Sequence, residues 1–278
     1  MKVLESKDGL CRIGLFALFF VCGLSIFVAP NFIQGGVETI YIIGLTASFL
    51  LSAIWLRSNK RLREYFQVFF AFVVASFVQF LHHALSELGW SDSTIEGMVF
   101  GLLFRTLFVV VPVVLLTKMS GGDMPSIYLK KGKLRLGLII GLATFLFFLS
   151  SVFVPQIAAA MFGGQELTFE RVIPWLPWIL ALVLLNGVRE ELWHRGLFLK
   201  KYEPFLGAKT SNLLQAIIFS LWHLDVQYTS ALPVFLVNVF FGALILGFVM
   251  QKTDSLLGSA LFHAGSDIPI IMGIFSNL

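Results

Sequence analysis

Hydrophobic residues along this chain come in long runs that short polar segments separate. A helix needs about 20 mostly apolar residues to cross a bilayer. Nine runs approach or reach that length, near residues 13–29, 38–56, 65–82, 97–117, 136–154, 175–199, 211–229, 232–250 and 255–276. The pattern therefore predicts an all-α fold, a polytopic transmembrane bundle of about eight to nine spans.

Charges in the connecting segments alternate along the chain. Basic residues follow the second, fourth, sixth and eighth runs, whereas the other connections are neutral or acidic. Since basic loops stay on the cytoplasmic side, we expect a cytoplasmic N-terminus and, with nine spans, an external C-terminus. The first run has a basic flank but no clear small-residue cleavage site, so we expect a retained anchor.

Composition supports a membrane protein and excludes two other classes. The chain is 58% hydrophobic, with 30 Phe among 278 residues. The net charge of +4 does not indicate a nucleic-acid-binding protein, because the basic residues gather in short loops between the apolar runs. Cys11 and Cys22 fall on one predicted helix, too far apart to bond, so no disulfide framework is expected. The compact length favours a prokaryotic cell (inner) membrane.

A cluster of charges interrupts the sixth run, at Glu190-Glu191-Leu192-Trp193-His194-Arg195. Ionisable residues inside a membrane are costly and usually functional. In an α-helix Glu191 and Arg195 are spaced i,i+4 and can pair. Glu190 is offset by about 100° and is expected to lack a fixed partner, which suits a general base. The alternative is a group of charges that snorkel to the membrane edge.

Two further polar groups interrupt apolar runs near the end of the chain. One is Phe219 to His223 and the other is His263 to Asp267. Measured by helix rise from the nearest basic loop, Glu190, His223 and His263 each lie about 15–21 Å into the bilayer. Three ionisable groups therefore converge near the midplane of a hydrocarbon core about 30 Å thick.

The segment after His263 is expected to be irregular. Gly265, Ser266 and Pro269 follow closely, and proline removes a backbone hydrogen bond. Broken backbone at membrane depth is tolerated where it lines a water-filled cavity. We therefore expect an intramembrane polar cavity lined by Glu190, His223, His263 and Asp267.

Together these residues resemble the motifs of the CPBP family of intramembrane proteases, the CAAX-protease and bacteriocin-processing (ABI) family. The matching patterns are Glu190-Glu191-x-x-x-Arg195, Phe219-x-x-x-His223 and His263-x-x-x-Asp267. The resemblance covers about the last hundred residues. It divides the chain into residues 1–170, membrane helices of unrecognised role, and residues 171–278, a catalytic core.

The resemblance implies a glutamate-type intramembrane endopeptidase without metal or other cofactor. Glu190 and His223 would activate water, while His263 and Asp267 would stabilise the oxyanion. Glu191, Arg195 and Phe219 would support the site. The family's third motif often ends in Asn, and an ionised Asp267 would rather orient His263. The implied partners are the bilayer and a membrane-embedded or lipid-anchored protein or peptide, with no nucleic acid.

Two other functions remain open from the residues alone. Glu191-x-x-His194 matches half of a di-iron motif, so a metal-dependent membrane hydrolase is one alternative. A non-catalytic scaffold or immunity protein of the same family is the other. A full set of buried charges speaks against the scaffold, and the absence of His-Glu-x-x-His excludes that type of zinc hydrolase.

Overall fold

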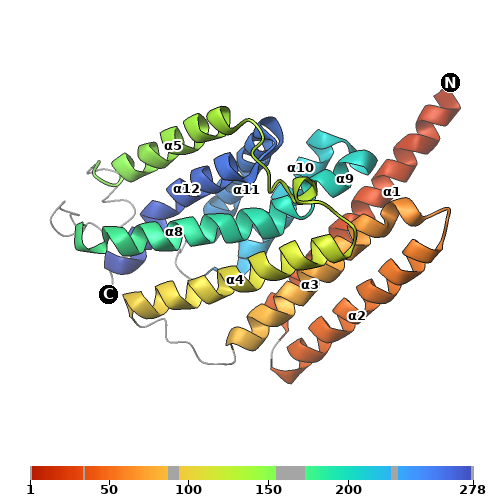
Figure 1. Ribbon diagram of the computed structural model, residues 1–278, viewed down its shortest axis with the longest axis horizontal. Coiled ribbons are helices and arrows are strands. Elements are labelled where there is room, and N and C mark those ends of the chain that lie inside the picture. Colours follow the sequence, from red (N-terminus) through yellow and green to blue (C-terminus); the bar gives the residue numbers. More distant parts are fainter. Residues whose placement is uncertain (1, 34, 87–93, 155–172, 227–230, 277–278) are drawn as a thin grey trace.

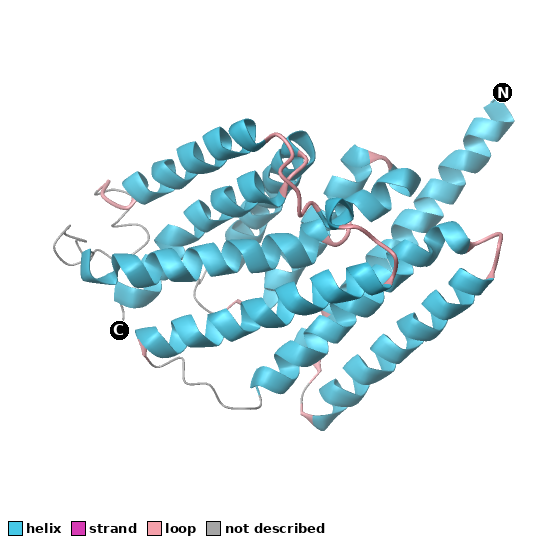
Figure 2. Cartoon of the chain, in the orientation of Figure 1, coloured by secondary structure: helices cyan, strands magenta, loops and turns pink. Residues whose placement is uncertain are grey.

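The computed structural model describes residues 2–33, 35–86, 94–154, 173–226 and 231–276, and the regular structure in them is helical. Figure 2 shows the helices and their loop connections. The α-helices are α1 (Lys2–Phe27), α2 (Gly36–Ser58), α3 (Phe66–Ser86), α4 (Ile95–Met119), α5 (Leu134–Ser151), α8 (Leu176–Glu190), α9 (Leu199–Leu206), α10 (Ala208–Trp222), α11 (Leu232–Thr253) and α12 (Leu256–Ser276). The expected all-α membrane bundle is confirmed.

Among the described residues, seven helices are long and apolar enough to cross a membrane, namely α1, α2, α3, α4, α5, α11 and α12. The other two expected spans are not among them. Helix α8 continues without a break into a π-helical turn, η5 (Glu191–Gly196), whereas α10 has only 15 residues. Fifteen residues rise only about 22 Å, less than the hydrocarbon core. The expected run 211–229 extends past α10, which ends at Trp222, and residues 227–229 of that run lie outside the described part of the chain.

The helices form two layers. In one layer α5, α12, α8, α4, α3 and α2 lie side by side in that order, each contacting the next (Figure 1). Helices α11, α10, α9 and α1 pack against this layer: α11 contacts α12 and α10, and α1 contacts α10 and α3. Helices α8 and α12 of the first layer and α10 of the second carry the three motifs, or end beside them, so the motifs meet where the two layers face each other.

Helix α12 is held closely on both sides by glycines. A Cβ at Gly187 of α8 would lie 2.6 Å from the carbonyl oxygen of Ala260, and one at Gly265 would lie 2.6 Å from the Cα of Phe145 in α5. Small residues let membrane helices approach at backbone distance. Gly265 therefore serves packing against α5.

The expected interruption of the last span is wrong. Helix α12 runs continuously from Leu256 to Ser276 and includes Pro269. The Ser266 hydroxyl donates to the carbonyl oxygen of His263 at 2.7 Å, which is the local bond of a serine within a regular helix. His263 and Asp267 are consequently on one face of an intact helix.

Candidate active site

The first motif lies where α8 changes from α-helical to π-helical. Glu190 is the last residue of α8, and all six residues of η5 are buried. Gly196 ends the π turn with its Cα against the carbonyl oxygen of Ile127, where a Cβ would have only 3.0 Å. Such π turns are rare and frequently occur at functional sites. A pure α-helical spacing, which the sequence suggested, does not describe this segment.

Glu191 and Arg195 form the predicted ion pair and are completely buried. Arg195 Nη1 donates to Glu191 Oε1, and Ser259 of α12 donates to the other carboxylate oxygen. His263 Nδ1 lies 2.7 Å from Glu191 Oε1. The guanidinium of Arg195 stacks over the Phe219 ring at 4.3 Å. Glu191 therefore connects the first motif to α12, and Arg195 connects it to α10.

Glu190 differs from the expectation of a carboxylate without a fixed partner. Arg189 Nη2 donates to Glu190 Oε1 at 2.6 Å. The other oxygen, Oε2, lies 3.5 Å from His263 Nε2. The adjacent arginine in the run Arg189-Glu190-Glu191 was the sequence signal for this contact. One oxygen of Glu190 is thus held, and the other faces His263.

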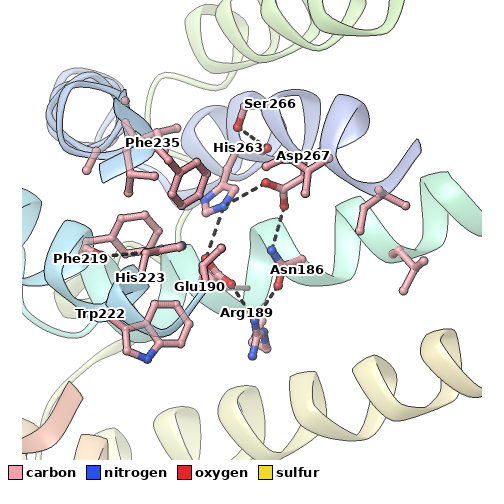
Figure 3. A pocket seen from close by; sticks show the side chains of 18 of the residues that line it. Asn186, Arg189, Glu190, Phe219, Trp222, His223, Phe235, His263, Ser266 and Asp267 are labelled. Carbon is pink, nitrogen blue, oxygen red and sulfur yellow. Dashed lines mark hydrogen bonds and ion pairs between the residues drawn. The ribbon is translucent and has the colours of Figure 1, made fainter. Parts of the chain in front are cut away.

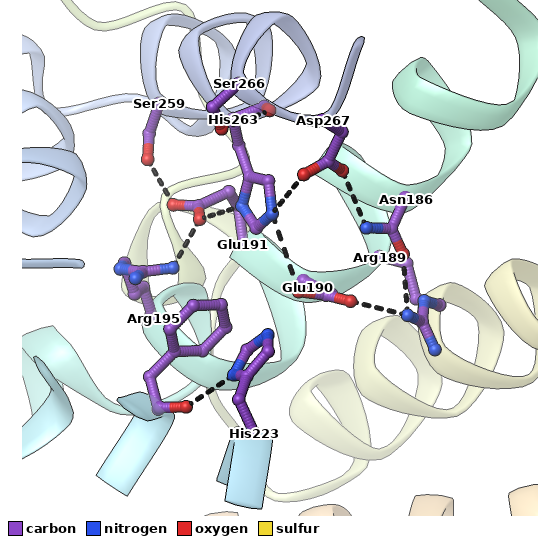
Figure 4. A network of polar contacts seen from close by, with 11 residues as sticks. Asn186, Arg189, Glu190, Glu191, Arg195, His223, Ser259, His263, Ser266 and Asp267 are labelled. Atoms are coloured by element: carbon purple, nitrogen blue, oxygen red, sulfur yellow. Dashed lines mark hydrogen bonds and ion pairs between the residues drawn. The ribbon is translucent and has the colours of Figure 1, made fainter. Parts of the chain in front are cut away.

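Asn186 and Arg189 complete a ring of polar contacts that sequence reasoning missed (Figure 4). Arg189 Nη2 donates to Asn186 Oδ1 at 2.6 Å, and Asn186 Nδ2 donates to Asp267 Oδ2 at 2.8 Å. Asp267 Oδ1 lies 3.6 Å from His263 Nε2. Since arginine can only donate, the orientation of the Asn186 amide is fixed. The ring therefore directs one oxygen of Asp267 and one of Glu190 toward the same imidazole nitrogen.

His223 lies in a short 3₁₀ turn just after α10 (His223–Asp225). Its Nδ1 is 2.8 Å from the carbonyl oxygen of Phe219. A carbonyl only accepts, so Nδ1 carries the hydrogen, and Nε2 of the neutral ring is an acceptor. The side-chain bond of His223 goes to Phe219 and not to Glu190. The end of α10 thus fixes the tautomer of His223.

A pocket of about 840 Å³ lies beside this polar ring and His223 (Figure 3). All four predicted catalytic residues line it, together with Asn186, Arg189 and Arg105. Most of the remaining wall is apolar, including Phe148 of α5, Leu182 of α8, Phe235 and Leu246 of α11, and Phe262 and Ile271 of α12. The pocket is therefore not the generally polar cavity that the sequence suggested: an apolar enclosure surrounds a compact group of ionisable side chains.

His194, the histidine of the possible metal motif, lies outside this pocket lining. Its ring is completely buried, with ring centres of Phe27 and Trp222 at 4.4 and 4.5 Å. Within the part of the chain that the structure describes, no three His, Cys, Asp or Glu side chains are placed to hold a metal ion.

Comparison with known proteins agrees with the motifs. Residues 172–268 match the family model described as type II CAAX prenyl endopeptidase Rce1-like. No curated protein and no solved structure matches the chain. The matched segment contains all three motifs, from Glu190 to Asp267, and the resemblance predicted from them is confirmed: over residues 172–268 this membrane protein is similar to the Rce1-like CAAX protease family.

Proposed function

We propose that the protein is an intramembrane endopeptidase that uses Glu190 and His223 to activate water. The observation that supports this most is the meeting of Glu190, His223, His263 and Asp267 at one pocket, although they come from α8, from the turn after α10 and from α12. The substrate is a membrane-embedded or lipid-anchored protein or peptide, as the family match to CAAX endopeptidases suggests. We place the protein in a prokaryotic cell membrane with its N-terminus in the cytoplasm.

Activation of water rests on the two acceptors that face the pocket. Glu190 Oε2 is not engaged by Arg189, and His223 Nε2 is an acceptor because Nδ1 donates to Phe219. A water held between such acceptors can lose a proton as its oxygen attacks the scissile carbonyl. The proton passes to Glu190 or His223 and then to the leaving amine. The new carboxylate and the amine are the two products.

His263 is the group that can stabilise the oxyanion. Its Nδ1 donates to Glu191, and its Nε2 faces two carboxylate oxygens, which only accept. Both ring nitrogens are therefore directed to donate. A donor fixed in advance in a water-poor site is an effective oxyanion stabiliser. Asp267, an acceptor at 3.6 Å, then orients His263 and does not contact the oxyanion itself.

Arg189 and Asn186 act as positioning residues in this mechanism. Glu190, Glu191 and Asp267 bring three carboxylates close to one imidazole, and Arg189 and Arg195 each contact one of them. A buried charge is tolerated only when it is paired. The two arginines therefore permit the carboxylates to lie side by side. The Asn186 amide bridges Arg189 and Asp267, because it accepts from Arg189 and donates to Asp267.

The proposed catalytic core of residues 171–278 does not form the pocket alone. Met98, Leu102 and Arg105 of α4 and Phe148 of α5 also line it. We therefore propose that the fourth and fifth spans supply part of an apolar wall that excludes water and receives the substrate's apolar side chains.

Comparative proteomics of membranes tests the proposal. Membranes from cells producing wild type, Glu190→Gln, His223→Ala or the exposed-site control Glu96→Gln are compared for truncated membrane proteins. The proposal predicts products with wild type and Glu96→Gln and the intact precursors with the other two variants. Identical product patterns in all four strains, with equal protein levels, would refute a protease function of this site.

A further inference from the structure

A second hollow, remote from the candidate active site, is lined by two arginines. It has a volume of about 390 Å³ and is bordered by Arg57, Arg63, Phe66, Gln67, Ser120 and Gly121. No carboxylate belongs to this lining among the described residues. The hollow therefore concentrates positive charge without an acidic partner in its wall.

Its position is at the ends of three membrane helices. Arg57 is in the last turn of the span Gly36–Ser58, Arg63 begins the span Arg63–Leu85, and Ser120 directly follows the span Ile95–Met119. Residues at the ends of spanning helices lie at headgroup level. A charged hollow at this level faces the phosphate layer of the bilayer.

The wall of the hollow is built by packing and hydrogen bonding. Gln67 Nε2 donates to the carbonyl oxygen of Ser120 at 3.2 Å, which ties α3 to the end of α4, and the Ser120 hydroxyl donates to the Thr117 carbonyl oxygen at 2.7 Å. The Arg57 guanidinium lies 5.5 Å from the centre of the Phe66 ring. The side chains of Gln67 and Ser120 hydrogen-bond within the protein, so the guanidinium groups of Arg57 and Arg63 are the donors available to a ligand.

The surface beside the hollow is apolar and faces outward. Ile54 and Leu50 are 55% and 41% exposed on the turns of α2 that precede Arg57, and Met119 is 74% exposed beside Ser120. In a helix, residues three and seven positions apart share a face. A ligand whose phosphate sits at Arg57 can therefore lay an acyl chain along Leu50 and Ile54.

We propose that this hollow is a binding site for the headgroup of an anionic phospholipid. Guanidinium groups present planar forks that match phosphate oxygens, and two from different helices can grip one phosphate from two sides. Basic pockets between membrane helices are suited to anionic headgroups. Free phosphate shares this chemistry, but only a lipid also uses the apolar strip of α2. The site is independent of the proposed protease function.

Native mass spectrometry of the purified protein in neutral detergent tests the site. The protein is titrated with phosphatidylglycerol, phosphatidylcholine or inorganic phosphate. Arg57→Gln/Arg63→Gln is compared with Lys60→Gln/Arg61→Gln, which removes the same charge from the same loop outside the hollow. We expect phosphatidylglycerol to bind wild type and the control within about twofold of each other, and the Arg57/Arg63 variant at least about tenfold more weakly.

Arg57→Lys/Arg63→Lys keeps the positive charge that sets topology and removes only the guanidinium forks. This variant therefore tests the site even if the neutral variant does not insert into the membrane. We expect it also to bind phosphatidylglycerol more weakly than wild type. Equal loss in the control pair, or equal binding of phosphatidylcholine, would show unspecific attraction and overturn the proposal. Binding of inorganic phosphate as tight as that of the lipid would overturn the lipid as ligand.

Discussion

His263 Nε2 lies 3.5 Å from Glu190 Oε2, one helical turn from the point where α8 and α12 touch at backbone distance. Gly187 makes this approach possible, because a Cβ there would lie 2.6 Å from the Ala260 carbonyl oxygen and 3.1 Å from the Ala264 nitrogen. The distance between the two ionisable groups thus depends on a residue without a side chain.

Replacing Gly187 by alanine should separate the two helices. We expect Gly187→Ala to lower the free energy of unfolding by about 1–3 kcal/mol, as overpacking does, and to reduce proteolysis more than it reduces folded protein. Gly44→Ala on α2 is the matched control, since no atom lies within 4 Å of its Cβ position. Thermal melts and cleavage rates of both variants measure the effect. A fully active Gly187→Ala protein would show that close approach is not needed.

Glu191→Gln should act on stability. The substitution leaves Arg195 completely buried without its counter-charge, and breaking one side of a buried pair costs about 3–5 kcal/mol. Ser259→Ala, which removes one donor to the same carboxylate and keeps the ion pair, should cost about 0.5–1.5 kcal/mol. Denaturation of the two purified variants gives both values. Equal stability of Glu191→Gln and wild type would contradict a stabilising pair.

Several features of the fold followed from the sequence, and others required the three-dimensional structure. Long apolar runs predict spans reliably, because a lipid environment permits little else, and seven are helices of spanning length. Pro269 was expected to interrupt the last span, but α12 continues through it, and Gly265, one turn earlier, packs against Phe145 of α5. The π turn could not be predicted, because the spacing of hydrophobic residues in the sequence does not distinguish it from an α-helix. The length of α10 was overestimated, because the α-helix ends at Trp222 and a 3₁₀ turn follows at His223.

In the site, the four motif residues were recognised by their polarity within apolar runs. Arg189 and Asn186 were missed because their significance lies in contacts across helices: Asn186 gains its meaning only from Asp267, 81 residues later in the chain. A search for polar residues one turn before Glu190 would have found Asn186. Which apolar side chains line the pocket could not be predicted, since an inward Phe and a lipid-facing Phe look alike in a sequence this hydrophobic.

The contact between Asn186 and Asp267 predicts a reciprocal effect. Asn186→Asp places two carboxylates face to face and should reduce turnover strongly. Combining it with Asp267→Asn restores one carboxylate and one amide in exchanged positions. Residues in direct contact couple by about 0.5–3 kcal/mol, so the double variant should regain roughly tenfold of the lost rate, equivalent to about 1.4 kcal/mol. Losses that simply add would refute the proposed positioning role, whether or not the protein is a protease.

A surface cluster should make stability depend on acid pH. Partial burial alone would raise the pKa of Asp254, but hydrogen bonds from Lys130 and Lys200 outweigh it and hold that pKa below its usual value. Such stabilisation is present above the ordinary pKa of an aspartate and is lost as the pH falls through the lowered value. Wild type should therefore melt at a higher temperature than Asp254→Asn at pH 7, and the difference should begin to shrink near about pH 4 and vanish only when the pH is below the lowered pKa of Asp254. A difference that persists in acid would contradict this contribution.

Glu190 is the proposed base that activates water for hydrolysis. The most direct test is the rate at which purified protein in liposomes cleaves a substrate identified by proteomics. Wild type, Glu190→Gln and the control Glu96→Gln are compared at equal amounts of folded protein, because the Gln side chain fills the same space but cannot take a proton from water. The account predicts cleavage by wild type and Glu96→Gln at similar rates and none by Glu190→Gln. A Glu190→Gln protein that cleaves at the wild-type rate would contradict it.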